Sequence, residues 1–163
     1  MDLTPYRRTE QVTIDAPPEA VYDLVADVAR MGEWSPVCTG GEYDADDASW
    51  FTGHNAIGDT KWSTRCHVVA ADRGREFAFI NCGGDGVREL VRWGFVMAGS
   101  AGGGTEVTQS WEVLPGYEEN FLAQGKTQDE LAQRLDFMQG LAETGMPETL
   151  DHVRRAAEAG AVG

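Results

Sequence analysis

The transition from a strand to a helix near the start of the chain decides the fold, and residues 11–28 carry it with the sequence QVTIDAPPEAVYDLVADV. Val12 and Ile14 alternate with polar residues, which is the period of a strand. Two prolines and a glutamate follow, and these residue types suit the first turn of a helix. Apolar residues from Val21 to Val28 then recur at helical spacing. The predicted elements are a strand over Tyr6–Asp15, a helix over Pro18–Asp27 and a short helical turn over Val28–Glu33.

Short alternating runs separated by glycine clusters fill the middle of the chain, a pattern typical of an antiparallel sheet built from hairpins. The glycines within 83–86 and 99–104 mark turns, because glycine adopts positive φ without steric cost. Residues 99–104 lack the Gly-Lys-Ser/Thr ending of a phosphate-binding loop and precede a strand pattern, so we expect no nucleotide site there. We predict strands over residues 39–44, 50–57, 60–71, 75–82, 87–98 and 105–114.

The last third of the chain is helical in pattern. Apolar residues from Leu131 to Ala157 recur at helical spacing, which predicts a long helix over about Gln128–Ala159. Gly145-Met146-Pro147 interrupts this pattern, so we expect the helix in one or two pieces. We expect the preceding segment, Pro115–Thr127, to be a loop that gates a cavity, a role that mobile loops commonly take.

The composition is that of one acidic globular domain. The chain has 163 residues and a formal net charge of −14, and one hydrophobic core can serve this length, so we expect a single domain over 1–163. The negative charge disfavours nucleic acid and anionic membrane surfaces as partners. No apolar run approaches the roughly 20 residues of a membrane span, and no signal-peptide pattern opens the chain. We therefore expect a cytoplasmic protein without stable membrane insertion.

Cysteines and histidines are too scattered to predict a metal centre. Cys38, Cys66 and Cys82 are odd in number and form no Cys-x-x-Cys pair, which argues against a disulfide framework and against zinc. The three histidines form no ligand pair either. We expect neither a metal nor a cofactor.

Several short motifs follow the predicted order of elements. They are Val12-x-Ile14-x-Ala16-Pro17-x-Glu19-x-Val21-Tyr22, Trp34-x-Pro36, Phe51-x-Gly53-x-Asn55, Trp62-x-Thr64, Gly74-x-x-Phe77-x-Phe79 and Gly103-Gly104-Thr105-x-Val107-Thr108. With them the chain resembles the START-like or Bet v 1-like superfamily (SRPBCC), and within it the bacterial polyketide cyclase/dehydrase group. The resemblance implies an α+β helix-grip fold, in which a curved seven-stranded antiparallel sheet wraps around a long C-terminal helix. It also implies two short helices after the first strand and a ligand cavity between sheet and helix.

Strand periodicity then indicates which side chains enter that cavity, because alternate residues of a strand point to opposite faces. The bulkier apolar set of each strand is taken as the inward set, which places His54 and His67 on the outer face. Apolar walls with a few polar groups are typical of small-molecule sites. The candidate ligand-binding residues are Phe51, Asn55, Trp62, Thr64, Cys66, Phe79, Asn81, Trp93, Phe95, Gln109 and Trp111.

Glu89 is the candidate catalytic residue. In the predicted strand 87–98 it shares a face with apolar residues, and a carboxylate in such surroundings can exchange a proton near neutral pH. The alternative is that Glu89 lies at the strand end, solvated or paired with Arg88 or Arg92. Cys66 also has two interpretations: a nucleophile, or a small buried hydrophobic residue, since no histidine shares its face.

Three functions stay open from the sequence. The first is a binding or carrier protein for a small hydrophobic molecule, which is aromatic, polyketide-like or lipid-like. The second is a catalytic polyketide cyclase, aromatase or dehydratase, in which Glu89 moves protons while Asn55 and Gln109 position carbonyl groups. The third is a non-enzymatic protein-interaction domain whose acidic surface meets a basic partner. We expect a small hydrophobic or aromatic molecule as the partner, no nucleic acid, and a monomer or homodimer.

Overall fold

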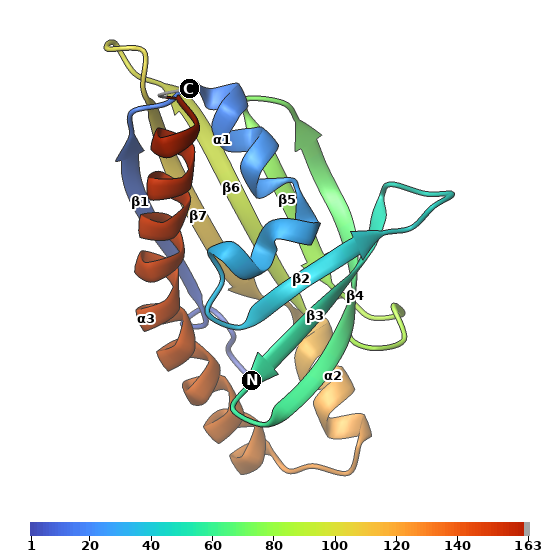
Figure 1. The fold of residues 1–163 in the computed structure, drawn as a ribbon. Coiled ribbons are helices and arrows are strands. Elements are labelled where there is room, and N and C mark those ends of the chain that lie inside the picture. The colour runs from blue at the N-terminus through green and yellow to red at the C-terminus, as the bar shows by residue number, and fades with distance from the viewer. Residues whose placement is uncertain (162–163) are drawn as a thin grey trace.

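Seven antiparallel strands form one curved sheet in the computed structural model, which describes residues 1–161, and a long helix packs along the sheet (Figure 1). This arrangement confirms the α+β helix-grip fold that the sequence predicts. The strands are β1 (Arg7–Ile14), β2 (Cys38–Tyr43), β3 (Trp50–Ile57), β4 (Thr60–Asp72), β5 (Glu76–Asn81), β6 (Val91–Gly99) and β7 (Thr105–Val113). The helices are α1 (Pro18–Val25), the 3-10 helix η1 (Val28–Glu33), α2 (Pro115–Ala123) and α3 (Gln128–Ala161).

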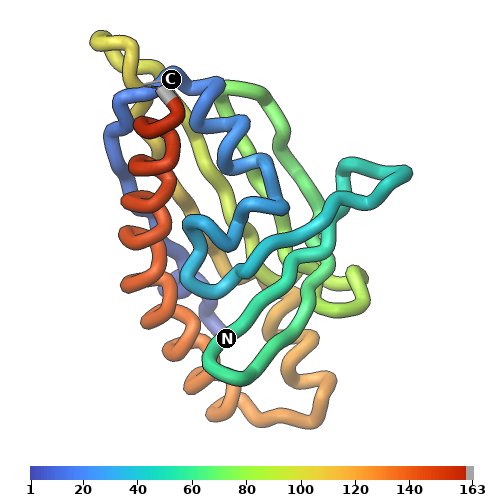
Figure 2. The backbone as a smooth tube through the Cα atoms, in the orientation of Figure 1, coloured from blue at the N-terminus to red at the C-terminus, as the bar shows by residue number. Residues whose placement is uncertain are grey.

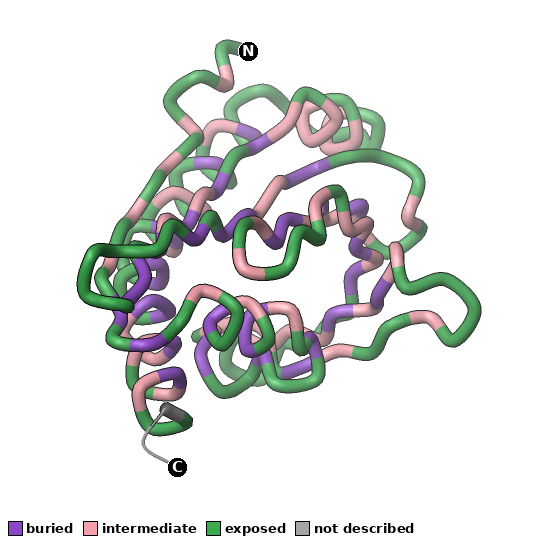
Figure 3. Tube along the Cα trace, turned by 90° about the horizontal axis from the view of Figure 1, so that it is seen from above, coloured by how far each residue is buried: buried purple, intermediate pink, exposed green. Residues whose placement is uncertain are grey.

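The strand order across the sheet is β1-β7-β6-β5-β4-β3-β2. β1 and β2 lie at opposite edges, so α1 and η1 carry the chain from one edge to the other (Figure 1). Register shifts between Cys38 and Gly40 in β2, and between Val68 and Ala70 in β4, are irregularities that bend a strand and increase its twist. Seen from above, the sheet curves strongly, and exposed loops project outward from it (Figure 3).

α1 confirms the helix predicted from the proline pair. Pro18 opens the helix, where its missing N–H costs no hydrogen bond, and Glu19 lies in the first turn. The apolar stripe predicted from the spacing is the buried face, because Val21, Leu24 and Val25 are all buried. The helix is therefore held by packing on one side rather than by its own propensity.

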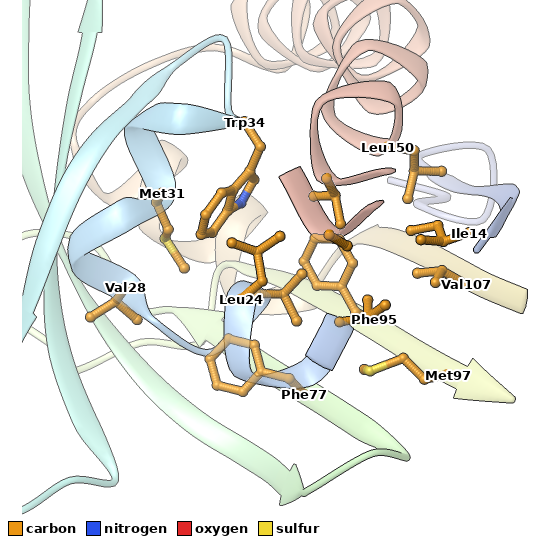
Figure 4. Packing of buried hydrophobic residues seen from close by; sticks show 14 of the residues in the cluster. Ile14, Leu24, Val28, Met31, Trp34, Phe77, Phe95, Met97, Val107 and Leu150 are labelled. Carbon is orange, nitrogen blue, oxygen red and sulfur yellow. The ribbon is translucent and has the colours of Figure 1, made fainter. Parts of the chain in front are cut away.

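A first cluster of buried hydrophobic residues joins the two short helices to the sheet and to the C-terminal half of α3. Figure 4 shows Leu24 from α1 between Trp34 and Phe77, and Leu150 of α3 next to Ile14 of β1, with Phe95 of the sheet between the two groups. Full burial of a large apolar side chain contributes about 1.5–3 kcal/mol each. This cluster holds together the end of the molecule that contains α1.

A second, separate cluster lies around the N-terminal half of α3. Leu131 and Leu135 of this helix are fully buried, and they belong with Trp111 and Val113 of β7 and with Leu90. Residues 1–161 thus contain two hydrophobic clusters instead of one continuous core. The space where they meet holds the candidate site.

The predicted strand 87–98 begins only at Val91, and this is a correction to the sequence prediction. The chain makes turns after β5, with Gly83 and Gly86 both at positive φ. Pairing between β5 and β6 starts where Asn81 faces Val91. Strand alternation therefore does not extend back over the residues before Val91.

Two further predictions concern helices: that segment 115–127 is a loop, and that the C-terminal helix forms one or two pieces. Segment 115–127, predicted as a loop, contains the helix α2, which opens with a proline in its first turn. α3 runs through Pro147 in one piece, although a proline removes one backbone hydrogen bond from a helix. Met146 and Leu150 on either side are buried, so tertiary packing holds the helix across the proline.

Candidate functional site

A cavity of about 400 Å³ lies between the inner face of the sheet and α3. Strands β2 to β7 and the connection between β5 and β6 form one side of it, and η1, the connection from η1 to β2, α2 and α3 form the rest. Pockets that hold small molecules have volumes of about 300–1,000 Å³, and their walls are mostly apolar. The cavity therefore has the size and the position of a small-molecule site.

The lining draws on both hydrophobic clusters. Phe51 and Phe95 belong to the first cluster, and Trp111, Ala142 and Met146 belong to the second. Protein interiors are normally close-packed, with few voids larger than a water molecule. A void of this size between two packed clusters is thus a feature that a bound molecule would fill.

All eleven candidate ligand-binding residues line this cavity. The strand register explains why: Phe51 faces Cys66, and Phe79 and Trp111 both face Trp93 across neighbouring strands. Alternation then brings residues at i and i+2 to the same face. Their role in binding stays a prediction. The eleven are Phe51 and Asn55 on β3, Trp62, Thr64 and Cys66 on β4, Phe79 and Asn81 on β5, Trp93 and Phe95 on β6, and Gln109 and Trp111 on β7.

The two strand histidines lie on the outer face, as predicted. His54 contacts Ser63 and Glu42, at 2.9 and 2.8 Å from its two ring nitrogens. His67 stacks on Trp50 with 4.6 Å between ring centroids. Neither histidine lines the cavity.

Glu89 does not line the cavity, so the inward position predicted from alternation is wrong and the alternative, a solvated position at the strand end, is the one observed. Its side chain is exposed, and the residue lies in the turn region before β6. The next residue, Leu90, donates its backbone N–H to Asn81 at 2.9 Å and is buried. Strand β6 begins at Val91, two residues after Glu89, which explains why strand periodicity misplaced Glu89.

Aromatic rings form much of the wall. Trp93 and Trp111 are tilted by 51° with 6.5 Å between centroids, and Phe51 meets Phe79 edge to face at 5.1 Å. Such pairs are stable arrangements of aromatic quadrupoles. Four of the five tryptophans line the cavity, and the fifth, Trp50, lies on the outer face.

Gln109 is the most unusual polar group in the cavity. Its side chain is 3% exposed, and its Oε1 is buried without a hydrogen-bond partner among the described residues. An unsatisfied buried polar group costs about 1–3 kcal/mol. A ligand group that binds the Gln109 amide would recover this free energy.

The other polar groups are partly satisfied within the protein. Asn55 Nδ2 donates to Thr64 Oγ1 and to the Gly53 carbonyl, both at a long 3.4 Å. Asn81 Oδ1 accepts the Gly83 backbone N–H at 2.8 Å, so this oxygen serves the turn. Asn55 and Thr64 are the pair most readily diverted to a ligand, because long hydrogen bonds are weak.

The surroundings of Cys66 favour its interpretation as a small buried hydrophobic residue over that as a nucleophile. Burial raises the pKa of its thiol to about 12, so the thiol is protonated at neutral pH and is a poor nucleophile. Its nearest polar neighbour is Thr64 Oγ1 at 3.7 Å. Cys66 therefore acts as a small polarisable part of the wall.

The helices supply lining residues that strand periodicity had no means of finding. Met138, Ala142, Met146 and Thr149 project from one face of α3 at intervals of three or four residues. Apolar periodicity marks such a face as buried but does not distinguish a cavity wall from a core. Arg134, also on α3, is the one charged residue among the described lining residues. Its position at the cavity was not predicted from the sequence.

The described residues offer no constellation for a metal ion. No three His, Cys, Asp or Glu side chains gather in a suitable group within residues 1–161. None of the helices in this range combines the length and the hydrophobicity that a membrane-crossing helix needs.

The fold and its cavity define a helix-grip protein with an internal space of ligand size. The family described as "Polyketide cyclase / dehydrase and lipid transport" matches residues 7–158, and the chain belongs to this family. A search of curated proteins finds no match.

Three solved structures illustrate the similarity. The chain is 32% identical to the Polyketide_cyc-like protein Cgl2372 from Corynebacterium glutamicum, with a TM-score of 0.67 over 96% of this chain and 93% of that chain. Protein NE0264 from Nitrosomonas europaea gives a TM-score of 0.71 at 9% identity over 100% of both chains. The di-domain ARO/CYC StfQ from the steffimycin biosynthetic pathway gives 0.68 at 10% identity, over 97% of this chain and 52% of StfQ. The latter two show the fold alone.

Proposed function

We propose that this protein binds one small hydrophobic molecule, aromatic, polyketide-like or lipid-like, in the cavity between sheet and α3. The observation that carries the proposal is an apolar cavity of about 400 Å³ lined in part by Gln109, whose buried side-chain oxygen has no hydrogen-bond partner among the described residues. Each square ångström of apolar surface removed from water contributes about 25 cal/mol. A ligand that fills the space between the two clusters gains this free energy, and one polar group on it satisfies Gln109.

Binding without a chemical step is favoured over the catalytic alternative. A cyclase or dehydratase that moves protons needs a group to carry them. Glu89, the carboxylate nominated for this purpose, is exposed outside the cavity, and the Cys66 thiol, whose pKa burial raises to about 12, holds its proton at neutral pH. The similarity to an ARO/CYC supports a polyketide-like ligand only through the shared fold.

Quenching of tryptophan fluorescence tests this proposal, because a bromine atom quenches an indole that it contacts. The probes are two uncharged amides, 11-bromoundecanamide for a lipid-like body and 6-bromo-2-naphthamide for an aromatic body. We expect at least one of them to quench saturably, since four of the five tryptophans line the cavity.

The fifth tryptophan provides the matched control. Trp50→Phe removes an emitter on the outer face, so the quenched fraction of the remaining emission rises. Trp111→Phe removes an emitter in the cavity wall, so this fraction falls. The reverse pattern in these variants would overturn the proposal, and so would the absence of saturable quenching by both amides and by the carboxylic acids of the same two bodies.

A further inference from the structure

Arg134 gives the cavity one positive charge and no negative one. Among the described lining residues it is the sole charged side chain, and no Asp, Glu or His accompanies it. This is unusual in a chain with 27 acidic and 13 basic residues. An anionic ligand group would therefore meet no like charge in the wall.

No carboxylate of the described residues lies within ion-pair distance of Arg134, although its helix offers several. Further along α3, Arg154 and Arg155 both pair with Asp151, at 2.6 and 2.7 Å. Glu130, one turn before Arg134 and at the favourable helical spacing, bonds to Thr127 at the start of the helix and pairs with Lys126 instead. The natural internal partner of Arg134 is thus engaged elsewhere.

Two aromatic residues contact the guanidinium. Its Nε donates to the Tyr117 hydroxyl at 3.3 Å, and its Cζ lies 5.5 Å from the centroid of the Phe137 ring. The two terminal nitrogens, Nη1 and Nη2, donate to no described group. A guanidinium that bonds through Nε leaves those two nitrogens as a planar fork, which can bind a carboxylate through two parallel hydrogen bonds.

Arg134 lies where the cavity meets solvent. Its side chain is exposed, and so are Ile57 and Trp62 of the β3–β4 hairpin, which also line the cavity. The end of this hairpin, α2 and the first turns of α3 gather at one end of the molecule (Figure 2). A charged ligand group at this mouth stays partly hydrated, so its desolvation cost is small.

We infer that the ligand is an amphipathic carboxylate, whose apolar body fills the cavity while its carboxylate binds Arg134 at the mouth. This inference rests on the proposed binding function and narrows its ligand class. Tyr117 acts as a positioning residue, because its hydroxyl accepts the hydrogen bond from Arg134 Nε. The net charge of −14 repels anions at long range, but this repulsion is screened beyond about 8 Å at physiological salt.

Matched acid and amide probes test the inference. 11-Bromoundecanoic acid and 6-bromo-2-naphthoic acid share their bodies with the two amides above and differ only in the head group. Affinities come from the same quenching titration at neutral pH, on the natural protein, on Arg134→Gln and on Arg155→Gln. Arg155 is the control, because it is an exposed arginine of the same helix that does not line the cavity.

We expect the natural protein to bind the acid of at least one pair about 10-fold more tightly than its amide, a difference typical of one charge-assisted hydrogen-bonded contact. Arg134→Gln should abolish this preference, because it weakens binding of the acid and leaves binding of the amide unchanged. Arg155→Gln should retain the preference. The pair with the stronger preference identifies an aliphatic or an aromatic body. Equal affinity for acid and amide in the natural protein would overturn the inference while the binding function stands. Absence of binding by all four probes would instead overturn both.

Discussion

Gln109 illustrates, at the scale of one residue, the free-energy cost that the proposed binding would recover. Its Oε1 has no partner, although the side chain is 3% exposed. Buried polar groups in folded proteins are nearly always hydrogen-bonded, so an exception calls for an explanation. The proposed binding function supplies one, because a bound molecule would complete the missing contact.

Gln109→Met should therefore affect stability and ligand binding differently. Methionine has a similar shape and removes the unsatisfied oxygen, so we expect the free energy of unfolding to stay level or to rise by about 1 kcal/mol. Binding of the brominated amides should weaken, because the amide of Gln109 no longer contacts them. Urea unfolding and the quenching titration measure the two effects. A clear loss of stability would show that the amide already has a partner in the empty protein.

Cys66 makes the protein less stable at alkaline pH. Burial raises the pKa of its thiol from 9.0 to about 12. Above pH 9 the unfolded chain releases a proton that the folded state keeps. The free energy of unfolding is therefore unaffected by this thiol below pH 9 and decreases as the pH rises towards 12. We expect the urea midpoint to fall between neutral pH and pH of about 10, and to fall less in Cys66→Ala. Identical pH dependence in both proteins would contradict this account.

The site residues that the sequence predicted and those that it missed differ in their kind of signal. The residues on the strands follow from alternation, because a strand places every second side chain on one face whatever it packs against. Arg134 has no such signal, since its position at the cavity depends on how α2 and α3 meet. Glu89 was misplaced because alternation was extended beyond the first paired residue of β6, Val91.

At the scale of elements, α3 forms one wall of the cavity. Near Gly145 this helix lies close to Pro36, in the segment that follows η1. A Cβ added at Gly145 would lie 3.1 Å from Pro36 Cγ, whereas one added at Gly140 would meet nothing within 4 Å. Both glycines lie within the same helix. The two positions therefore differ in tertiary packing and not in helix propensity.

This pair gives a prediction for the helix. Gly140→Ala should stabilise the protein by about 1 kcal/mol, the helix propensity difference between the two residues. Gly145→Ala should lose most or all of that gain, because the new methyl group meets Pro36. Thermal unfolding should show a rise of about 2–4 °C for the first variant only. An equal rise in both would show that α3 does not approach Pro36 so closely.

The elements themselves were predictable where the local pattern was strong. The strand–proline–helix sequence at the start of the chain and the long apolar periodicity at its end lead directly to β1, α1 and α3. α2 was missed because it has no fully buried residue, so its sequence carries no apolar stripe. Continuity of α3 through Pro147 depends on the buried neighbours Met146 and Leu150, which is a tertiary effect.

At the scale of the whole molecule, the fold creates a space that its own side chains do not fill. The resemblance implied a cavity, but its volume depends on how far two hydrophobic clusters stand apart, and local pattern does not encode that separation. The central claim is that this space of about 400 Å³ is a binding site.

Native mass spectrometry of the natural protein and of Ala142→Phe tests this claim most directly. Ala142 is buried on α3 and lines the cavity, so phenylalanine there fills part of the space. Both proteins are incubated with 11-bromoundecanamide and 6-bromo-2-naphthamide, whose bromine isotopes mark any adduct, and circular dichroism confirms that the variant is folded. The account predicts a one-to-one adduct on the natural protein that denaturation releases, and little or none on the variant. No adduct on the natural protein, or equal adducts on both, would contradict it.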